Sequence, residues 1–158
     1  MPELPLLGRR GGGWVALQFA LMGAIVVAAL VGPGWPEALA LPLRAVGAAA
    51  ALAGVLVGIA AGRALGDALT PFPRPARSAA LVERGPYRVV RHPIYAAGLL
   101  FFCGLSLVAS PAALLGTAAL AVLWALKAAV EERFLLERYP GYAEYVRRVR
   151  YRLLPRVY

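Results

Sequence analysis

Four long apolar segments limit what this chain can fold into. We place them at residues 14–31, 43–61, 94–109 and 112–130. A helix needs about 20 mostly apolar residues to cross a bilayer, and each segment is close to that length. A segment inside lipid must satisfy its own backbone hydrogen bonds, which leaves α-helices and closed β-barrels. The segments lack the alternation of barrel strands, so the sequence predicts an all-α, polytopic membrane bundle with four transmembrane helices.

Composition supports a membrane location. Hydrophobic residues make up 61% of the chain and charged residues only 16%, whereas soluble domains are about half apolar and a quarter charged. The net charge is +9, but the arginines cluster beside apolar segments, where they fit an anionic membrane surface. We therefore expect the lipid bilayer as a partner, with no nucleic acid and no obligatory protein partner.

The arginines also predict how the chain is oriented. The N-terminus carries two arginines, residues 62–93 contain six and the tail from residue 131 contains seven. The links at residues 32–37 and at Ser110-Pro111 contain none. Cytoplasmic loops carry the excess of Lys and Arg, so we expect both termini and the 62–93 loop in the cytoplasm. The alanine-, leucine- and arginine-rich composition indicates a GC-rich bacterium, and hence a bacterial inner membrane.

Two features predict how the helices pack. The second segment is rich in small residues, and Gly54 and Gly58 have the G-x-x-x-G spacing that allows close helix contact. An alanine- and glycine-rich segment also produces this spacing by chance, and both interpretations stay open. The third and fourth segments are joined only by Ser110-Pro111, which predicts a tight antiparallel hairpin.

A proline-rich connection leads into the third segment. It reads "TPFPRPARSAALVERGPYRVVRHP" over residues 70–93, and its prolines favour irregular structure, with a turn at "RGP". Pro93 suits the first position of a helix. His92 would then be the N-cap residue, beside helix N–H groups that attract negative charge. Taken alone, His92 and the neighbouring arginines are also explained as structural residues and membrane-edge anchors.

Charged residues mark the end of the fourth segment. Glu131 and Glu132 follow it, and Lys127 lies four residues before Glu131 on the same helix face. A charge in a membrane segment is costly, which makes Lys127 a functional candidate. The alternative is that Lys127 extends to the cytoplasmic edge of the bilayer. Beyond it, apolar residues at helical spacing, interrupted by Pro140-Gly141, predict two short amphipathic helices at the interface.

Two motifs flank the last two apolar segments. They are "GPYRVVRHPIYAAGLL" and, further along, "EERFLLERYPGYAEYVRRVRYRLLP". Together they resemble the isoprenylcysteine carboxyl methyltransferase and phospholipid methyltransferase superfamily, which comprises integral-membrane enzymes that use S-adenosylmethionine. The resemblance covers residues 72–156. It implies a single methyltransferase domain over residues 1–158, in which 72–156 bind the cofactor and the C-terminal helices close its pocket.

The resemblance also implies roles for individual residues. The implied cofactor-binding residues are Leu81, Val82, Tyr87, Arg91, His92, Pro93, Tyr95, Glu131 and Glu132. The implied substrate-binding residues are Lys127, Tyr142 and Tyr145. Some members carry arginine where this chain has Lys127, and the two residues are not interchangeable. We assign no catalytic residue, and expect His92 and Glu131 to position the cofactor.

The favoured function is methyl transfer from S-adenosylmethionine to an isoprenylcysteine carboxylate, a phospholipid amine or a thiol. Steroid-type membrane reductases share the Arg-His-Pro-x-Tyr region and bind NADPH. They commonly carry Asn at the position of Ile94 and Gly-Glu after the Tyr, whereas this chain reads "HPIYAAG". A non-catalytic membrane protein is the other alternative. With one Cys and one His, no Cys–His metal spacing exists and no metal is expected.

Overall fold

The structure, a computed structural model, describes residues 7–8, 11–74 and 80–155. Within these ranges every regular element is helical and no strand is present, which confirms the all-α class. The elements are α1 (Gly12–Val31), α2 (Glu37–Leu65), η1 (Gly66–Ala68), η2 (Gly85–Arg88), α3 (Pro93–Ala109), α4 (Pro111–Arg138) and α5 (Tyr142–Arg148). The arginines at 9, 10, 77 and 156, which the orientation prediction uses, lie outside the described residues.

The helices have the length and surface of a membrane bundle. Helix α1, helix α2 with η1, and helix α4 are each long and apolar enough to cross a membrane, and α3 is a shorter apolar helix. With 17 residues, α3 rises about 25 Å, close to the hydrocarbon thickness of about 30 Å. The outward side chains are apolar; Leu30, Leu41 and Leu115 are each more than three-quarters exposed. Apolar surface of this extent fits lipid, and the chain is an integral membrane protein.

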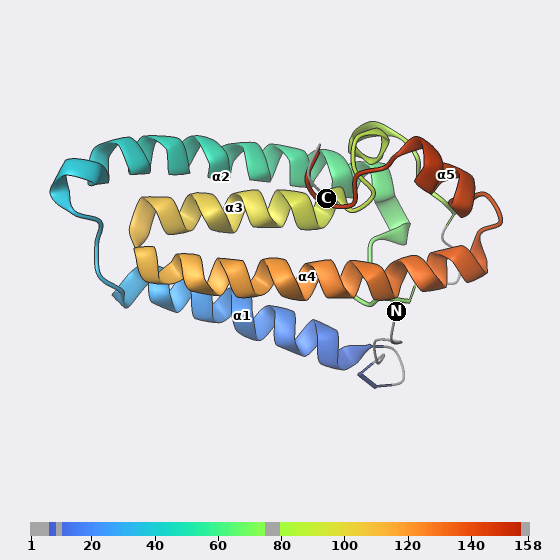
Figure 1. The fold of residues 1–158 in the computed structure, drawn as a ribbon, viewed down its shortest axis with the longest axis horizontal. Helices are drawn as coiled ribbons and strands as arrows, with labels where there is room; N and C mark the ends of the chain where they lie inside the picture. The colour runs from blue at the N-terminus through green and yellow to red at the C-terminus, as the bar shows by residue number, and fades with distance from the viewer. Residues whose placement is uncertain (1–6, 9–10, 75–79, 156–158) are drawn as a thin grey trace.

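The four long helices run alongside one another in the order α2, α3, α4, α1 (Figure 1). Helix α2 packs on α3, and α1 packs on α4. Ser110 alone joins α3 to α4, and its hydroxyl accepts a hydrogen bond from the Ala112 amide at 3.2 Å, which caps α4. The predicted tight hairpin is therefore confirmed.

Glycines bring α2 and α3 into close contact. A Cβ atom added at Gly54 would lie 2.7 Å from the Ala97 carbonyl oxygen, and one added at Gly104 would lie 2.5 Å from the Gly47 carbonyl oxygen. At Gly58 the nearest atom would be the Ala97 Cβ at 3.6 Å, which is ordinary contact. Gly54 therefore matters for packing together with Gly47 and Gly104, and the G-x-x-x-G partner Gly58 does not.

Helix α4 continues past the point where its apolar segment ends. Its 28 residues rise about 42 Å, so its last turns project beyond a hydrocarbon core of about 30 Å. Residues 131–138 extend the spanning helix, and only α5 is separate in the described part of the tail. The prediction of two short C-terminal helices is therefore wrong. Residues 131–139 contain no proline or glycine, so nothing in the sequence ends α4 where its apolar segment ends.

The α3–α4 hairpin determines which residues of α4 lie beside the N-terminal end of α3. His92 is the N-cap residue of α3 and Pro93 is its first residue, as predicted. His92 lies 18 residues before Ser110, so an antiparallel partner of equal rise brings it level with residue 128. Glu131 and Glu132 are one turn further along. The start of α3 thus faces the first projecting turn of α4.

Candidate functional site

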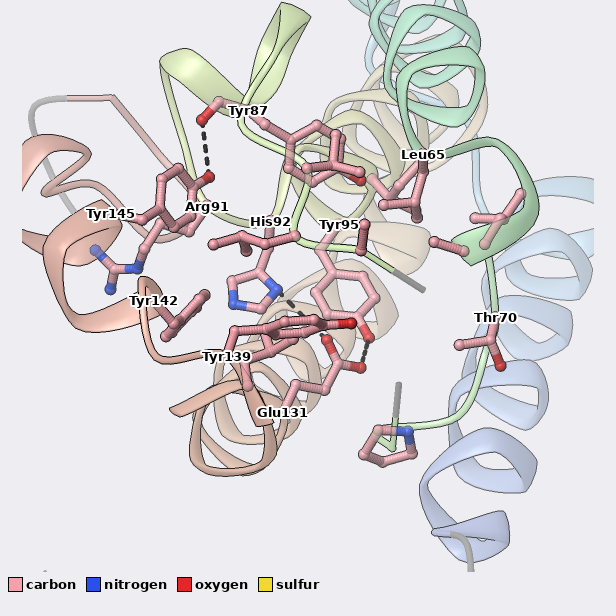
Figure 2. A pocket seen from close by; sticks show the side chains of 18 of the residues that line it. Leu65, Thr70, Tyr87, Arg91, His92, Tyr95, Glu131, Tyr139, Tyr142 and Tyr145 are labelled. Atoms are coloured by element: carbon pink, nitrogen blue, oxygen red, sulfur yellow. Dashed lines mark hydrogen bonds and ion pairs between the residues drawn. The ribbon is translucent and has the colours of Figure 1, made fainter. Parts of the chain in front are cut away.

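A cavity of about 140 Å³ lies where α2 ends, α3 begins, and the projecting part of α4 meets α5 (Figure 2). Its walls combine aromatic, aliphatic and charged side chains from segments far apart in the sequence. The lining residues are Leu65, Ala68, Leu69, Thr70, Phe72, Pro73, Ala80, Leu81, Val82, Tyr87, Arg91, His92, Ile94, Tyr95, Glu131, Leu135, Tyr139, Tyr142 and Tyr145.

His92 is buried between two carboxylates. Its Nδ1 atom lies 3.4 Å from Glu131 Oε2, and its Nε2 atom lies 3.2 Å from Glu132 Oε1. Burial lowers the pKa of His92, but hydrogen bonds and charge attraction from Glu131 and Glu132 outweigh it and leave the pKa raised. Both ring nitrogens are therefore occupied. The His92 ring is placed to orient the two carboxylates, which leaves it little capacity to bind a further group.

Glu131 and Glu132 point in different directions. The Glu131 carboxylate lines the cavity and accepts a hydrogen bond from the Tyr95 hydroxyl. Glu132 does not line the cavity; its oxygens accept from Arg91 Nε at 2.7 Å and Arg152 Nη2 at 2.6 Å. Successive residues of a helix are about 100° apart around its axis, which separates the two side chains. One carboxylate is left facing the cavity, and the other is fully used in holding the structure together.

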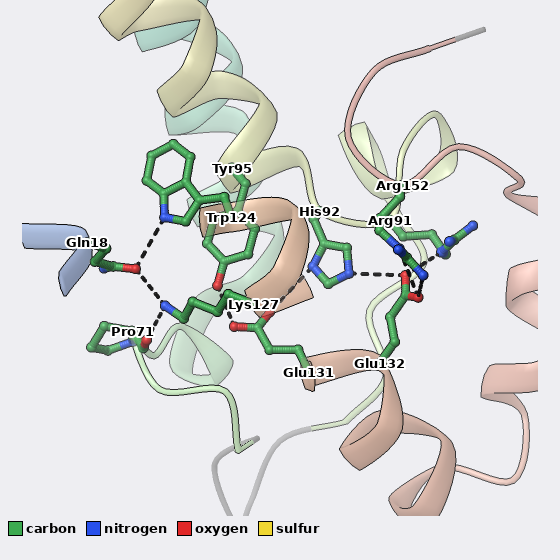
Figure 3. A network of polar contacts seen from close by, with 10 residues as sticks. All are labelled: Gln18, Pro71, Arg91, His92, Tyr95, Trp124, Lys127, Glu131, Glu132 and Arg152. Atoms are coloured by element: carbon green, nitrogen blue, oxygen red, sulfur yellow. Dashed lines mark hydrogen bonds and ion pairs between the residues drawn. The ribbon is translucent and has the colours of Figure 1, made fainter. Parts of the chain in front are cut away.

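Glu132 is the centre of a clasp that fixes the C-terminal segment to the start of α3 (Figure 3). Besides the ion pairs, the Arg91 amide donates to the Tyr151 carbonyl and the His92 amide to the Arg152 carbonyl, both at 2.9 Å. Arg91 Nη1 also donates to the Val149 and Arg150 carbonyls, at 2.9 and 2.7 Å. Sequence reasoning missed Arg152. A tail arginine looks like a membrane anchor, and no local pattern reveals its partner 20 residues away.

The two cavity tyrosines of α5 differ in the environment of their hydroxyls. Tyr145 donates to the Tyr87 carbonyl at 2.8 Å. The hydroxyl of Tyr142 is buried and has no hydrogen-bond partner among the described residues. Burial raises the pKa of Tyr87, Tyr142 and Tyr145, so all three stay protonated near neutral pH. An orphaned buried hydroxyl at a cavity wall is available to a ligand.

The structure brings most of the predicted site residues to this one cavity. Those that line it are Leu81, Val82, Tyr87, Arg91, His92, Tyr95, Glu131, Tyr142 and Tyr145. Pro93, Glu132 and Lys127 do not line it. Lys127 is fully buried, and its amine donates to Gln18 and to the Pro71 carbonyl of the connection after α2, so it contacts protein groups. Within the described ranges no group of three or more His, Cys, Asp or Glu side chains is placed to hold a metal ion.

The cavity wall also contains residues that sequence reasoning did not assign. Leu135 and Tyr139 follow Glu131 at intervals of four along the chain, so their helical spacing was a usable signal. Leu69, Thr70, Phe72 and Pro73 come from the connection after α2. An irregular segment has no periodicity, and its position against the site follows only from tertiary contacts.

A similar protein is the cobalt-zinc-cadmium resistance protein CzcN of Cupriavidus metallidurans. The two are 38% identical over 74 residues, which is 46% of this chain and 34% of CzcN. The chain therefore spans about a third of the length of that curated relative.

The family model described as phospholipid methyltransferase matches residues 43–141. This region includes most of α2, all of α3 and α4, and the connection between α2 and α3. It contains His92, Tyr95 and Glu131, and it excludes α1 and α5. Since the match covers more than half of the chain, this protein belongs to the phospholipid methyltransferase family.

Proposed function

We propose that the protein is a membrane methyltransferase that binds S-adenosylmethionine in this cavity and methylates a lipophilic or small acceptor. The observation that carries the proposal is the Glu131 carboxylate. It lies in the wall of an aromatic cavity, held by Tyr95 and His92. In a member of the phospholipid methyltransferase family, this is a site for a polar, cationic cofactor at the edge of an apolar bundle.

The residues present fit such a cofactor. Glu131 is an acceptor for an ammonium group or for ribose hydroxyls. The Tyr87 and Tyr145 rings in the wall suit a cationic sulfonium, while Leu81 and Val82 provide apolar contact for a base. The unpartnered Tyr142 hydroxyl gives a further polar contact. Arg91 and Glu132 are used in the clasp, so we give them a positioning role and not a cofactor contact.

When bound, S-adenosylmethionine supplies an electrophilic methyl group on sulfur. The chain's own residues bind the cofactor and orient it. His92 and Tyr95 fix the Glu131 carboxylate, and near-attack geometry is the main contribution required of the protein. No described residue is assigned as a general base, and a carboxylate or thiolate acceptor would need none.

The acceptor classes remain phospholipid amine, isoprenylcysteine carboxylate and thiol. A position at the end of a membrane bundle suits a polar cofactor that arrives from the cytoplasm and a lipophilic acceptor that arrives from the bilayer. We place the protein in a bacterial inner membrane with both termini in the cytoplasm, on the arginine distribution. No nucleic acid and no obligatory protein partner belong to the proposal.

Binding of S-adenosylhomocysteine to the purified protein, measured by calorimetry, tests the cofactor assignment. We expect Glu131→Gln to weaken binding at least tenfold, because a charged acceptor is worth about 1.5–3 kcal/mol. Glu137→Gln is the matched control, since Glu137 is an exposed residue on the same helix. Binding of NADPH without S-adenosylhomocysteine would assign the chain to the reductase class instead.

Incubation with methyl-labelled cofactor and extracted lipids or thiols then identifies the acceptor by mass spectrometry. Label in a phospholipid, a prenylated carboxylate or a thiol selects one class. If protein that binds the cofactor transfers no label to any extract, the activity part of the proposal fails.

A further inference from the structure

A second polar cluster lies behind the cavity, inside the membrane bundle (Figure 3). Gln18 of α1 accepts hydrogen bonds through its side-chain oxygen from Lys127 Nζ at 2.6 Å and from Trp124 Nε1 at 3.3 Å. Lys127 is fully buried and Gln18 is 7% exposed. Burying a lysine in a membrane segment is costly, so its partners and its purpose need a physical account.

Lys127 uses its amine to hold the connection that follows α2. Besides Gln18, Nζ donates to the Pro71 carbonyl at 2.7 Å. The same amine lies 5.3 Å from the centre of the Tyr95 ring, within the range of a cation–π contact. A lysine offers three donors and no acceptor. Among the described residues its partners are Gln18, Pro71 and Tyr95, and of these only Tyr95 lines the cavity.

The connection held in this way is a wall of the cavity. We define the connector as residues 69–74, of which Leu69, Thr70, Phe72 and Pro73 line the cavity. Its second attachment is Arg74, whose guanidinium lies 5.0 Å from the centre of the Phe134 ring. Lys127 and Phe134 are seven residues apart on α4, so both lie on one face of that helix. Glu131, on the same face between them, reaches the cavity.

The cluster also contacts the ring of Tyr95. The Tyr95 ring stacks on Trp124, with centroids 5.2 Å apart, and on His92, with centroids 5.7 Å apart. Trp124 in turn is bonded to Gln18. The Gln18 side-chain oxygen therefore contacts both Trp124 and Lys127, and each of these two side chains contacts the Tyr95 ring.

We propose that Gln18 and Lys127 are positioning residues that fix the connector and Tyr95 as walls of the cofactor cavity. Helix α1 lies outside the region matched by the family, residues 43–141, yet through Gln18 it becomes part of the site's support. The consequence for cofactor binding rests on the proposed function; the consequence for the connector does not.

The test compares three variants at one position. Gln18→Met keeps the length of the side chain but removes the acceptor, Gln18→Asn keeps the amide but is one methylene shorter, and Gln18→Glu keeps a long acceptor. Hydrogen exchange is followed at the Leu69 and Phe72 amides, which are bonded to the Gly66 carbonyl and the Thr70 hydroxyl. Calorimetry gives the Kd for S-adenosylhomocysteine.

We expect exchange in the connector to rise about tenfold in Gln18→Met and Gln18→Asn, and the Kd to rise by a similar factor. Gln18→Glu should restore both. The control is Thr117→Val, which removes a buried hydrogen bond to Ser106 of 3.0 Å within the α3–α4 hairpin and away from the connector. It should leave connector exchange unchanged.

Two results would overturn the proposal. One is unchanged connector exchange in a folded Gln18→Met or Gln18→Asn protein; the other is failure of Gln18→Glu to restore protection. If Gln18→Met does not accumulate, Gln18→Asn provides the same comparison. Altered connector exchange in a protein that binds no S-adenosylhomocysteine at all would uphold the positioning role and reject the proposed cofactor.

Discussion

The α2–α3 contact and the projecting end of α4 are held together in opposite ways. In the first, glycines let two backbones approach so closely that an added Cβ at Gly54 or Gly104 would overlap carbonyl oxygens. In the second, charged side chains such as Glu132, Arg91 and Arg152 join the elements through ion pairs. Lipid-embedded helices associate largely through close packing, whereas a polar site needs directional partners. The comparison therefore distinguishes the α2–α3 contact, which supports the bundle, from the projecting end of α4, which forms the cavity.

The largest expected effect comes from Glu132→Ala. It removes one carboxylate from Arg91, His92 and Arg152 together. We expect the free energy of unfolding to fall by about 3–5 kcal/mol, because buried cations lose their counter-charge. Thermal unfolding of the purified protein measures the change. The control Glu137→Ala, at an exposed position, should change stability by less than about 0.5 kcal/mol. If Glu132→Ala and Glu137→Ala lower stability equally, the ion pairs of Glu132 do not hold this end of the molecule together.

The glycine contact is tested by Gly54→Ala. The new methyl group would lie 2.6 Å from the Phe101 amide nitrogen, and we expect a loss of about 1–3 kcal/mol from overpacking. Gly58→Ala is the matched control, because its Cβ would meet the nearest atom at 3.6 Å. The midpoint of thermal unfolding should fall for Gly54→Ala alone. Alanine has the higher helix propensity and would by itself raise stability. A similar fall for both variants would therefore show that the close approach at Gly54 is not what sets the stability of this contact.

A smaller effect distinguishes the two buried tyrosines of α5. Tyr145→Phe loses the hydrogen bond to the Tyr87 carbonyl and should lower the free energy of unfolding by about 1 kcal/mol. Tyr142→Phe removes a hydroxyl without a partner among the described residues, so the unliganded protein should lose no stability. The Kd for S-adenosylhomocysteine should nevertheless rise for Tyr142→Phe. If Tyr142→Phe destabilises the unliganded protein as much as Tyr145→Phe does, its hydroxyl is not reserved for a ligand.

The smallest expected effect is a pH dependence of stability from His92. Burial lowers the pKa of His92, the carboxylates of Glu131 and Glu132 raise it, and the net result is a raised pKa. A group whose pKa is higher in the folded state contributes its full stability below the unfolded pKa, about 6.5, and loses it as pH rises through the folded value. Melting temperatures should therefore decline over that range for the native protein. His92→Gln should remove this part of the slope, and an unchanged slope would contradict the prediction.

Much of the site was predictable from local sequence. The Arg-His-Pro run fixed His92 as an N-cap and Pro93 as the first helical residue, because those positions have strong local preferences. The location of Glu131 opposite His92 follows from the short Ser110 link and helical rise. The distinct roles of Glu131 and Glu132 were not predictable, since two adjacent acidic residues look alike until their partners are known.

The sequence by itself determined the membrane bundle, the α3–α4 hairpin and the segment that forms the polar end. These depend on apolar length, proline position and residue spacing, which are local quantities. Only the tertiary structure decided that Lys127 turns to Gln18 and Pro71, that Arg152 meets Glu132, and that the connector lines the cavity. Each of these pairs joins residues far apart in the chain. A polar side chain can be satisfied by many partners, and only packing selects among them.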